Sequence, residues 1–346
     1  MPASVAHMLI AHKGLKRLQE DEDAALAEFA KILDNPLRKE NYQAYMNLGS
    51  LGPDLYYFGN LSKGIKDILV DGYVQAKAVT AWAYHLHSSR PNEFPLKLVE
   101  IVFRDVERKG KKVVLNVDDY RKLAYIAGHL SHIAADQIIH PIVNEIAGPY
   151  YRDGKNRKEH RKAEVFQDCF LYEEVYRAED KSTPKYKFFE QDFRGWVDCV
   201  RGPTTENTKD WFRYFLQRGF IETYGSAPRE DEIEDAVDGL LLSLRAAKKV
   251  GPYKKAAKEY AKGRNGAKFQ KYIRKPKYLR YYEQAVELSV IYMTALCKIY
   301  ELLRAGKDFA DSDKESFRKI VSNADLSCPL QKDILKKAQG TLRKFT

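Results

Sequence analysis

The chain has 346 residues, and its 59 lysines and arginines against 48 aspartates and glutamates give a formal net charge of +11. Its content of 44% hydrophobic and 12% aromatic residues is typical of a folded protein and excludes an intrinsically disordered one. Four cysteines without a C-x-x-C pair exclude a disulfide scaffold and a cysteine zinc knuckle. No run of about 18 apolar residues occurs, so we expect no transmembrane segment.

The first twelve residues, MPASVAHMLIAH, have no basic start, and His7 and His12 interrupt their apolar run. A secretory signal peptide needs both features, so we expect none here. The expected location is therefore cytoplasmic. If the protein contacts a membrane, we expect peripheral contact at the inner membrane surface.

Helical periodicity dominates the chain. Apolar residues recur at spacings of three and four in the segments 23–33, 65–79, 123–146 and 288–303. The best strand signal, KVVLNV at 112–117, follows a turn-like stretch and predicts a small hairpin or an extended linker. The sequence thus predicts an all-α protein, and it contains no internal repeat.

All eight histidines fall within the first 160 residues. His132, Asp136 and His140 are spaced four apart, so at about 100° per residue they share one face of the predicted helix. A shorter row of the same kind follows at His160 and Glu164. A single such histidine is more often a surface residue or a hydrogen-bonded core residue. A whole row is costly to bury unless a cation compensates it, and imidazole and carboxylate are ordinary zinc ligands.

Asp54 lies in the segment NLGSLGPDLYYFG at 47–59. Two glycines and a proline allow a tight turn that brings a carboxylate and the backbone close to a metal. The alternative is an ordinary Pro-Asp turn.

Together these segments resemble the bacterial zinc-dependent phospholipase C family, which shares its fold with the S1/P1 nucleases. The matching pieces follow the family's order: MPASVAHMLIA, NLGSLGPDLYYFG, HSSRPNEF, GHLSHIAADQIIHPIVN and EHRKAEVFQD. The resemblance implies an all-α, multi-helix phospholipase C/P1 nuclease-like fold with additional C-terminal helices. It spans residues 1–174, the expected catalytic core, and leaves 175–346 as a helical extension packed on that core.

The resemblance also implies a site that holds two or three zinc ions. His132 and Asp136 look like the family's HxxxD pair, with Asp136 bridging two metals; the other implied ligands are Asp54 and His87 for the first metal, His7 for the second, and His140, His160 and Glu164 for the third. His85 is the open alternative to His87. The N-terminal tryptophan of the secreted enzymes has no counterpart here, and the gap from Asp136 to His140 is shorter than theirs.

Such a site implies a zinc-dependent phosphodiester hydrolase of phospholipase C type, in which a metal-activated water attacks a phospholipid or a related phosphodiester. Asp54 would be a ligand that also orients or deprotonates this water. Two alternatives stay open. One is an S1/P1-like nuclease or nucleotidase, and the other is a non-catalytic, zinc-stabilised binding protein.

The positive charge is concentrated in residues 245–280, which contain 14 lysines and arginines and one acidic residue, Glu259. Aromatic residues interleave with these cations, as in surfaces that meet phosphates. The segment therefore predicts an anionic partner, either a membrane surface or a nucleic acid, with Lys254, Lys255, Lys258 and Lys262 as candidate contacts. The alternative is a solvated pair of helices with no binding role.

Overall fold

The computed structural model describes residues 4–35, 41–59, 79–110, 112–150, 152–176, 206–247, 256, 258–259, 266–273, 277–326 and 333–345. Helices dominate these residues, which confirms the predicted all-α fold. The only sheet in the described part is a hairpin in which β1 (Glu107–Lys109) pairs antiparallel with β2 (Lys112–Val114). The strand signal at 112–117 thus forms part of a small hairpin, with β2 at its start.

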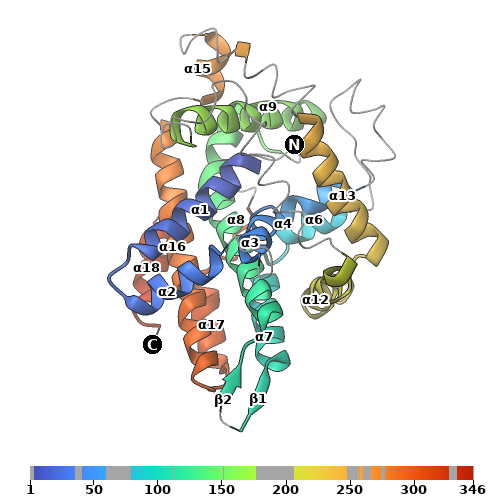
Figure 1. The fold of residues 1–346 in the computed structure, drawn as a ribbon. Coiled ribbons are helices and arrows are strands. Elements are labelled where there is room, and N and C mark those ends of the chain that lie inside the picture. The colour runs from blue at the N-terminus through green and yellow to red at the C-terminus, as the bar shows by residue number, and fades with distance from the viewer. Residues whose placement is uncertain are drawn as a thin grey trace.

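The long helix α8 (Val117–Ala147) runs through the centre of the molecule (Figure 1). It packs between α3 (Tyr42–Ser50) and α16 (Lys277–Arg304), while α1 (Ser4–Gln19) crosses both α16 and α8. α9 (Gly154–Leu171) lies across the end of α8, near the start of α1. The functional side chains described below come from these helices and their neighbours.

The sequence explains where α8 begins and ends. The side chain of Asn116 accepts hydrogen bonds from the main-chain N–H groups of Asp118 and Asp119, and Asp119 accepts one from the N–H of Asn116. This reciprocal cap satisfies donors that a helix N-terminus leaves unpaired. Gly148, with φ of +81°, follows the last helical residue, where glycine adopts a left-handed φ without steric cost.

The other described elements flank this centre. Those before α8 in the chain are α2 (Ala24–Leu33), α4 (Gly52–Leu55), η1 (Tyr56–Phe58), α6 (Val79–Ser88) and α7 (Glu93–Asp105). Those after α9 are the π-helical turn η2 (Tyr172–Tyr176), α12 (Glu206–Tyr224), α13 (Glu230–Ala247), α15 (Ala267–Ile273), α17 (Asp311–Ile320) and α18 (Ile334–Leu342).

Three of the four predicted helices are confirmed, because α2, α8 and α16 contain the periodic segments 23–33, 123–146 and 288–303 almost entirely. The fourth, 65–79, lies outside the described residues except for Val79, which begins α6. Buried side chains of α8 and α16 belong to one continuous hydrophobic core. The division of the chain at residue 174 stays a prediction. No helix in the described ranges has both the length and the apolar character needed to cross a bilayer.

Candidate metal centre

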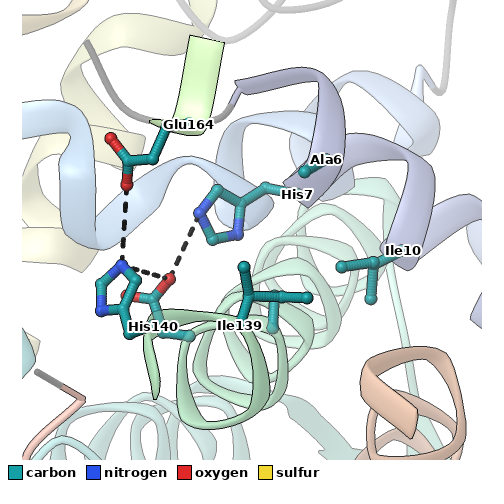
Figure 2. Close-up of a pocket in the computed structure, with 8 residues that line it drawn as sticks. Ala6, His7, Ile10, Ile139, His140 and Glu164 are labelled. Atoms are coloured by element: carbon teal, nitrogen blue, oxygen red, sulfur yellow. Dashed lines mark ion pairs between the residues drawn. The ribbon is translucent and has the colours of Figure 1, made fainter. Parts of the chain in front are cut away.

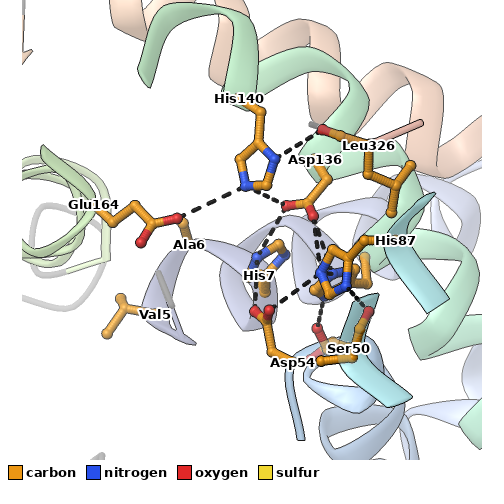
Figure 3. Close-up of polar contacts among 12 residues, drawn as sticks. Val5, Ala6, His7, Ser50, Asp54, His87, Asp136, His140, Glu164 and Leu326 are labelled. Carbon is orange, nitrogen blue, oxygen red and sulfur yellow. Dashed lines mark hydrogen bonds and ion pairs between the residues drawn. The ribbon is translucent and has the colours of Figure 1, made fainter. Parts of the chain in front are cut away.

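Asp136 is the centre of a buried cluster of imidazoles. Its Oδ1 lies 3.4 Å from Nε2 of His7 and 3.3 Å from Nε2 of His140, while its Oδ2 lies 3.2 Å from Nε2 of His132 and 3.5 Å from Nε2 of His87. The three α8 residues among them share one face of that helix, as their spacing predicted. Figure 3 shows Asp136 and His140 on this face. Asp136 itself is 2% exposed. A single buried carboxylate therefore faces four imidazoles from three helices.

Asp54 closes this cluster from α4. Its Oδ1 lies 3.2 Å from Nε2 of His87, and its Oδ2 lies 3.7 Å from Nε2 of His7. His87 and His132 point their Nε2 atoms at each other across 3.4 Å. Two ligand atoms on a tetrahedral zinc ion are separated by roughly 3.3 Å. The separations of His87 from Asp54, His132 and Asp136, and that of His132 from Asp136, thus match the edges of a zinc coordination sphere.

Main-chain carbonyl groups fix the orientation of three of the imidazoles. His87 donates from Nδ1 to the carbonyl of Ala83 (2.6 Å), and His132 donates to that of Ser50 (2.9 Å). His140 donates to the carbonyl of Leu326 (2.8 Å). Because each Nδ1 is used in this way, each Nε2 is turned toward the carboxylates. A metal-ligating histidine is typically held by such a hydrogen bond from its other ring nitrogen.

Close contact between α3 and α8 places the carbonyl of Ser50. A Cβ atom added to Gly49 would lie 2.0 Å from the carbonyl oxygen of Tyr125, and one added to Gly128 would lie 2.0 Å from that of Met46. No Cβ fits at either position, so only glycine permits this helix crossing. The predicted turn is present at Leu51, between α3 and α4. The role of Gly49 differs from the expected one, since it approaches α8 rather than a metal.

A second pair of ligand candidates comes from α9. His160 Nε2 lies 3.1 Å from Glu164 Oε1, which lies 3.7 Å from Nε2 of His140. The spacing of four places His160 and Glu164 on one face of α9, and the packing of α9 on α8 brings that face to the cluster. The next residue on this helix face, Asp168, accepts hydrogen bonds from the main-chain N–H groups of Val5 and Ala6. It thereby fixes the start of α1 directly beside His7.

Burial and mutual charge shift the pKa values of these groups strongly. Burial, helped by His132, lowers the pKa of His7 to about 4. Although burial opposes it, the carboxylate of Asp136 raises the pKa of His140 to about 10. Burial also disfavours the charged carboxylate of Asp136, but His140 and His132 hold the pKa of that group well below its usual range. The cluster thus keeps two carboxylates, Asp136 and Glu164, ionised by placing positive charge beside them.

The donor set fits zinc. Three groups each place their ligand atoms within 4.8 Å of one another: His7, His132 and Asp136; Asp54, His87 and His132; and His140, His160 and Glu164. Within the described part of the chain, buried Asp136 Oδ2 has no hydrogen-bond partner, although Nε2 of His132 and Nε2 of His87 lie 3.2 and 3.5 Å from it. Ligand atoms that face one another in a protein interior without good hydrogen bonds are costly to bury. A divalent cation bound between them compensates this cost. Nitrogen and carboxylate oxygen are the ligands that zinc prefers besides thiolate.

The remaining histidines lie off this cluster. His85, the alternative to His87, packs against Tyr224 with the two rings tilted and their centroids 5.3 Å apart. His129 is fully buried against Phe94, and burial lowers its pKa well below the ordinary value. His12 bonds to Asn47. The geometry therefore brings His87 and not His85 to Asp54.

The candidate anionic-partner surface lies mostly outside the described residues. Lys254, Lys255 and Lys262 are not described, and Lys258 is exposed. The role of residues 245–280 stays a prediction.

Sequence reasoning missed the groups that orient the site. The carbonyls of Ser50, Ala83 and Leu326 are main-chain atoms, which no residue pattern marks. Asp168 did carry a signal, because it continues the His160 and Glu164 row at the same spacing of four.

A small pocket opens on the His7 and His140 side of the cluster, as Figure 2 shows. Its polar wall is formed by four candidate ligands, and its apolar wall by small and aliphatic side chains of α1 and α8. The lining residues are Ala6, His7, Ile10, Ala135, Asp136, Ile139, His140 and Glu164. Polar and apolar surface therefore meet directly at the candidate ligands.

The helical fold and the histidine and carboxylate cluster define a class of protein, the all-α proteins with a candidate multinuclear metal centre. A family model described as zinc dependent phospholipase C matches residues 6–226. Since the match covers more than half of the chain, this protein belongs to the zinc-dependent phospholipase C family, and the resemblance seen in the sequence is confirmed. Membership indicates a hydrolase that uses zinc. No curated protein and no solved structure matches the chain.

Proposed function

We propose that this protein is a zinc-dependent phosphodiester hydrolase of phospholipase C type. It would cleave a phospholipid into a diacylglycerol and a phosphorylated head group. The observation that carries the proposal is the position of Asp136, whose two oxygens face the imidazoles of all three candidate ligand groups. A binding protein does not need three groups of candidate metal ligands around one carboxylate. Phosphoryl transfer, in contrast, is accelerated by closely spaced cations.

The candidate ligands divide among three ions. The first ion would be held by His132, His87, Asp54 and Asp136. The second would be held by His7 together with the carboxylates of Asp54 and Asp136, which it shares with the first. His140, His160 and Glu164 would hold the third. When bound, these ions would polarise phosphoryl oxygens and lower the pKa of a water molecule, so that it is a stronger nucleophile at neutral pH.

The protein's own groups would complete the reaction. Asp54 presents its two oxygens to different imidazoles, so it can hold a ligand position while orienting the attacking water and accepting its proton. Asp136 and Glu164 stay ionised, because neighbouring histidines lower their pKa values against the effect of burial. The buried cluster excludes bulk water, which strengthens these electrostatic interactions.

The pocket places aliphatic side chains beside the candidate ligands. The side chains of Ile10 and Ile139 stand opposite those of His140 and Glu164 (Figure 2). The space between these walls is about that of one water molecule, so the pocket would admit the attacking water and not the substrate itself.

A hydrolysis panel with the zinc-loaded protein tests the proposal. It compares choline-type phospholipids, nucleotides and single-stranded nucleic acid, and zinc is measured by elemental analysis. We expect hydrolysis of the phospholipids with at least two zinc ions per chain. Hydrolysis of nucleic acid alone, weakened steeply by salt, would instead identify a nuclease. Bound zinc with no hydrolysis of any substrate would identify a binding protein.

The pair His87 and His85 supplies a matched control. His87→Ala removes an imidazole that lies 3.2 Å from Asp54, and we expect it to lower zinc content by about one ion per chain and activity by at least tenfold. His85→Ala removes the same group two residues away, where it contacts Tyr224, and zinc content should stay at the wild-type level. Equal effects of the two substitutions would contradict the ligand assignment.

Contact with an anionic membrane from a cytoplasmic position is the further part of the proposal. It rests on the basic segment 245–280 of the sequence. Charge reversal at Lys254, Lys255, Lys258 and Lys262 should weaken binding to vesicles that contain phosphatidylserine. Unchanged vesicle binding would leave the segment as a solvated surface.

A further inference from the structure

A short segment that follows α17, residues 321–326, reaches the candidate metal centre from the C-terminal half of the chain. It lies outside the matched family region, 6–226. Its last residue, Leu326, donates its main-chain N–H to the carbonyl of His87 (2.9 Å). The carbonyl of the same residue accepts the hydrogen bond from Nδ1 of His140 (2.8 Å). One peptide residue thus connects two candidate ligand residues, and Figure 3 shows its position beside His140.

The anchor segment, as we call residues 321–326, is held in place by buried polar side chains. Asn92 donates to the carbonyl of Val321 (2.9 Å), and Gln137 donates to that of Ser322 (3.0 Å). The hydroxyl of Tyr292 donates to Gln137 Oε1 (2.7 Å) and accepts from the N–H of Ser322 (3.3 Å). These contacts use specific amide and hydroxyl groups, so the backbone of the segment is fixed independently of any metal.

Additional contacts bind the same segment to the end of α6. Ser88 donates its hydroxyl to Asp325 Oδ1 (3.1 Å), directly after His87 in the chain. The side chains of Val321 and Leu326 are fully buried. Polar and apolar contacts therefore hold both ends of the segment.

The three oriented imidazoles differ in where their carbonyl partner comes from. His87 uses Ala83, one turn earlier in its own helix, and His132 uses Ser50 of α3. Both partners lie within the family region. His140 uses Leu326, which lies 186 residues further along the chain. Of these three orientations, only that of His140 depends on the C-terminal part of the protein.

We propose that the anchor segment is a positioning element for the third zinc ion, the one assigned to His140, His160 and Glu164. The carbonyl of Leu326 holds Nδ1 of His140, and this turns Nε2 toward Asp136 and Glu164. Residues that orient a metal-ligating histidine in this way change metal affinity by about 10- to 100-fold when they are lost. The inference rests on the proposed function, because it requires that these residues bind zinc.

Loosening the anchor segment without touching a ligand tests the inference. Tyr292→Phe removes one oxygen atom that bridges Gln137 and Ser322, and Asn92→Ala removes the donor to Val321. Native mass spectrometry gives the number of zinc ions per chain, and a chelator titration gives the affinity of each. We expect the double variant to bind the third ion at least tenfold more weakly and to keep the other two. His160→Ala identifies which ion is the third.

Tyr300→Phe is the matched control. Tyr300 lies on the same helix, α16, and is also buried. Its substitution removes a hydroxyl contact to Tyr120 and not a contact to the anchor segment. This variant should bind all ions as the wild type does. Circular dichroism checks that each variant is folded. If the double variant does not fold, Tyr292→Phe alone carries the comparison.

The outcomes separate the two proposals. A wild-type protein that binds no zinc would contradict the proposed function itself. A wild type that binds zinc at the third group, together with variants that bind it equally well, would overturn the anchor inference and leave the function standing. Loss of all three ions in parallel would also overturn the inference, since the segment would then stabilise the fold and not one ion.

Discussion

The carboxylate of Asp168 accepts a hydrogen bond of 2.9 Å from the main-chain N–H of Ala6, the residue that precedes His7. Its other oxygen accepts one of 3.3 Å from the N–H of Val5. These two donors lie in the first turn of α1, where a helix has unpaired N–H groups and a partial positive charge. A fully buried carboxylate from α9 thus fixes the backbone that carries a candidate ligand from α1.

Asp168→Asn should therefore destabilise the protein and weaken the binding of the zinc ion assigned to His7. Both oxygens of Asp168 accept from N–H groups, so an amide places a donor against a donor. We expect a loss of about 2 kcal/mol in the free energy of unfolding, measured by urea denaturation. Asp23→Asn is the matched control, because Asp23 caps α2 through one oxygen only and asparagine caps a helix equally well. Equal stability of the two variants would contradict this role of Asp168.

The crossing of α3 and α8 gives a second prediction. Gly128→Ala places a Cβ within 2.0 Å of the carbonyl oxygen of Met46, so the two helices must separate and carry Ser50 away from His132. We expect a destabilisation of at least about 2 kcal/mol and a lower zinc content. Gly340→Ala adds the same methyl group inside α18, where no atom lies within 4 Å. That control should be neutral or stabilising by about 0.5–1 kcal/mol, since alanine favours helix more than glycine does.

The candidate site was more predictable from sequence than its supports were. His132, Asp136 and His140 follow helical spacing, and a periodic pattern of polar residues on an apolar helix is visible in sequence. The resemblance then supplied His7, Asp54 and His87, which lie on other helices. Ser50 and Leu326 were out of reach, because their contribution is a main-chain carbonyl and depends on how distant helices pack. Helix positions follow from periodicity, whereas contacts between helices depend on shape.

Acid should destabilise the metal-free protein in a defined pH window. Burial lowers the pKa of His7 from 6.5 to about 4, so between these values the unfolded chain binds a proton that the folded chain does not. Stability is therefore present above pH 6.5 and is lost as the pH falls toward 4, by about 3 kcal/mol from this residue. His12, His129 and His160 have pKa values lowered by burial and act in the same direction.

Urea unfolding of the metal-free protein at pH 4.5 to 7 measures this loss. His7→Gln removes one titrating group, so the slope of stability against pH should decrease by about one proton. His140 does not oppose the trend below pH 6.5, because a raised pKa gives stability that is fully present below pH 6.5 and is lost as the pH rises from there toward 10. Stability that stays constant from pH 6.5 to 4.5 would contradict a buried, neutral His7.

Zinc binding should release protons at neutral pH. Asp136 and Glu164 raise the pKa of His140 to about 10 against the effect of burial, so in the metal-free protein this imidazole carries a proton on each nitrogen. Nδ1 keeps its proton for Leu326, and the proton on Nε2 must leave before that atom can bind a metal. Isothermal titration calorimetry in two buffers of different ionisation enthalpy should therefore give different apparent binding enthalpies at pH 7. His140→Gln should reduce the release by about one proton, and equal enthalpies for the wild type in both buffers would show that His140 is not a ligand through Nε2.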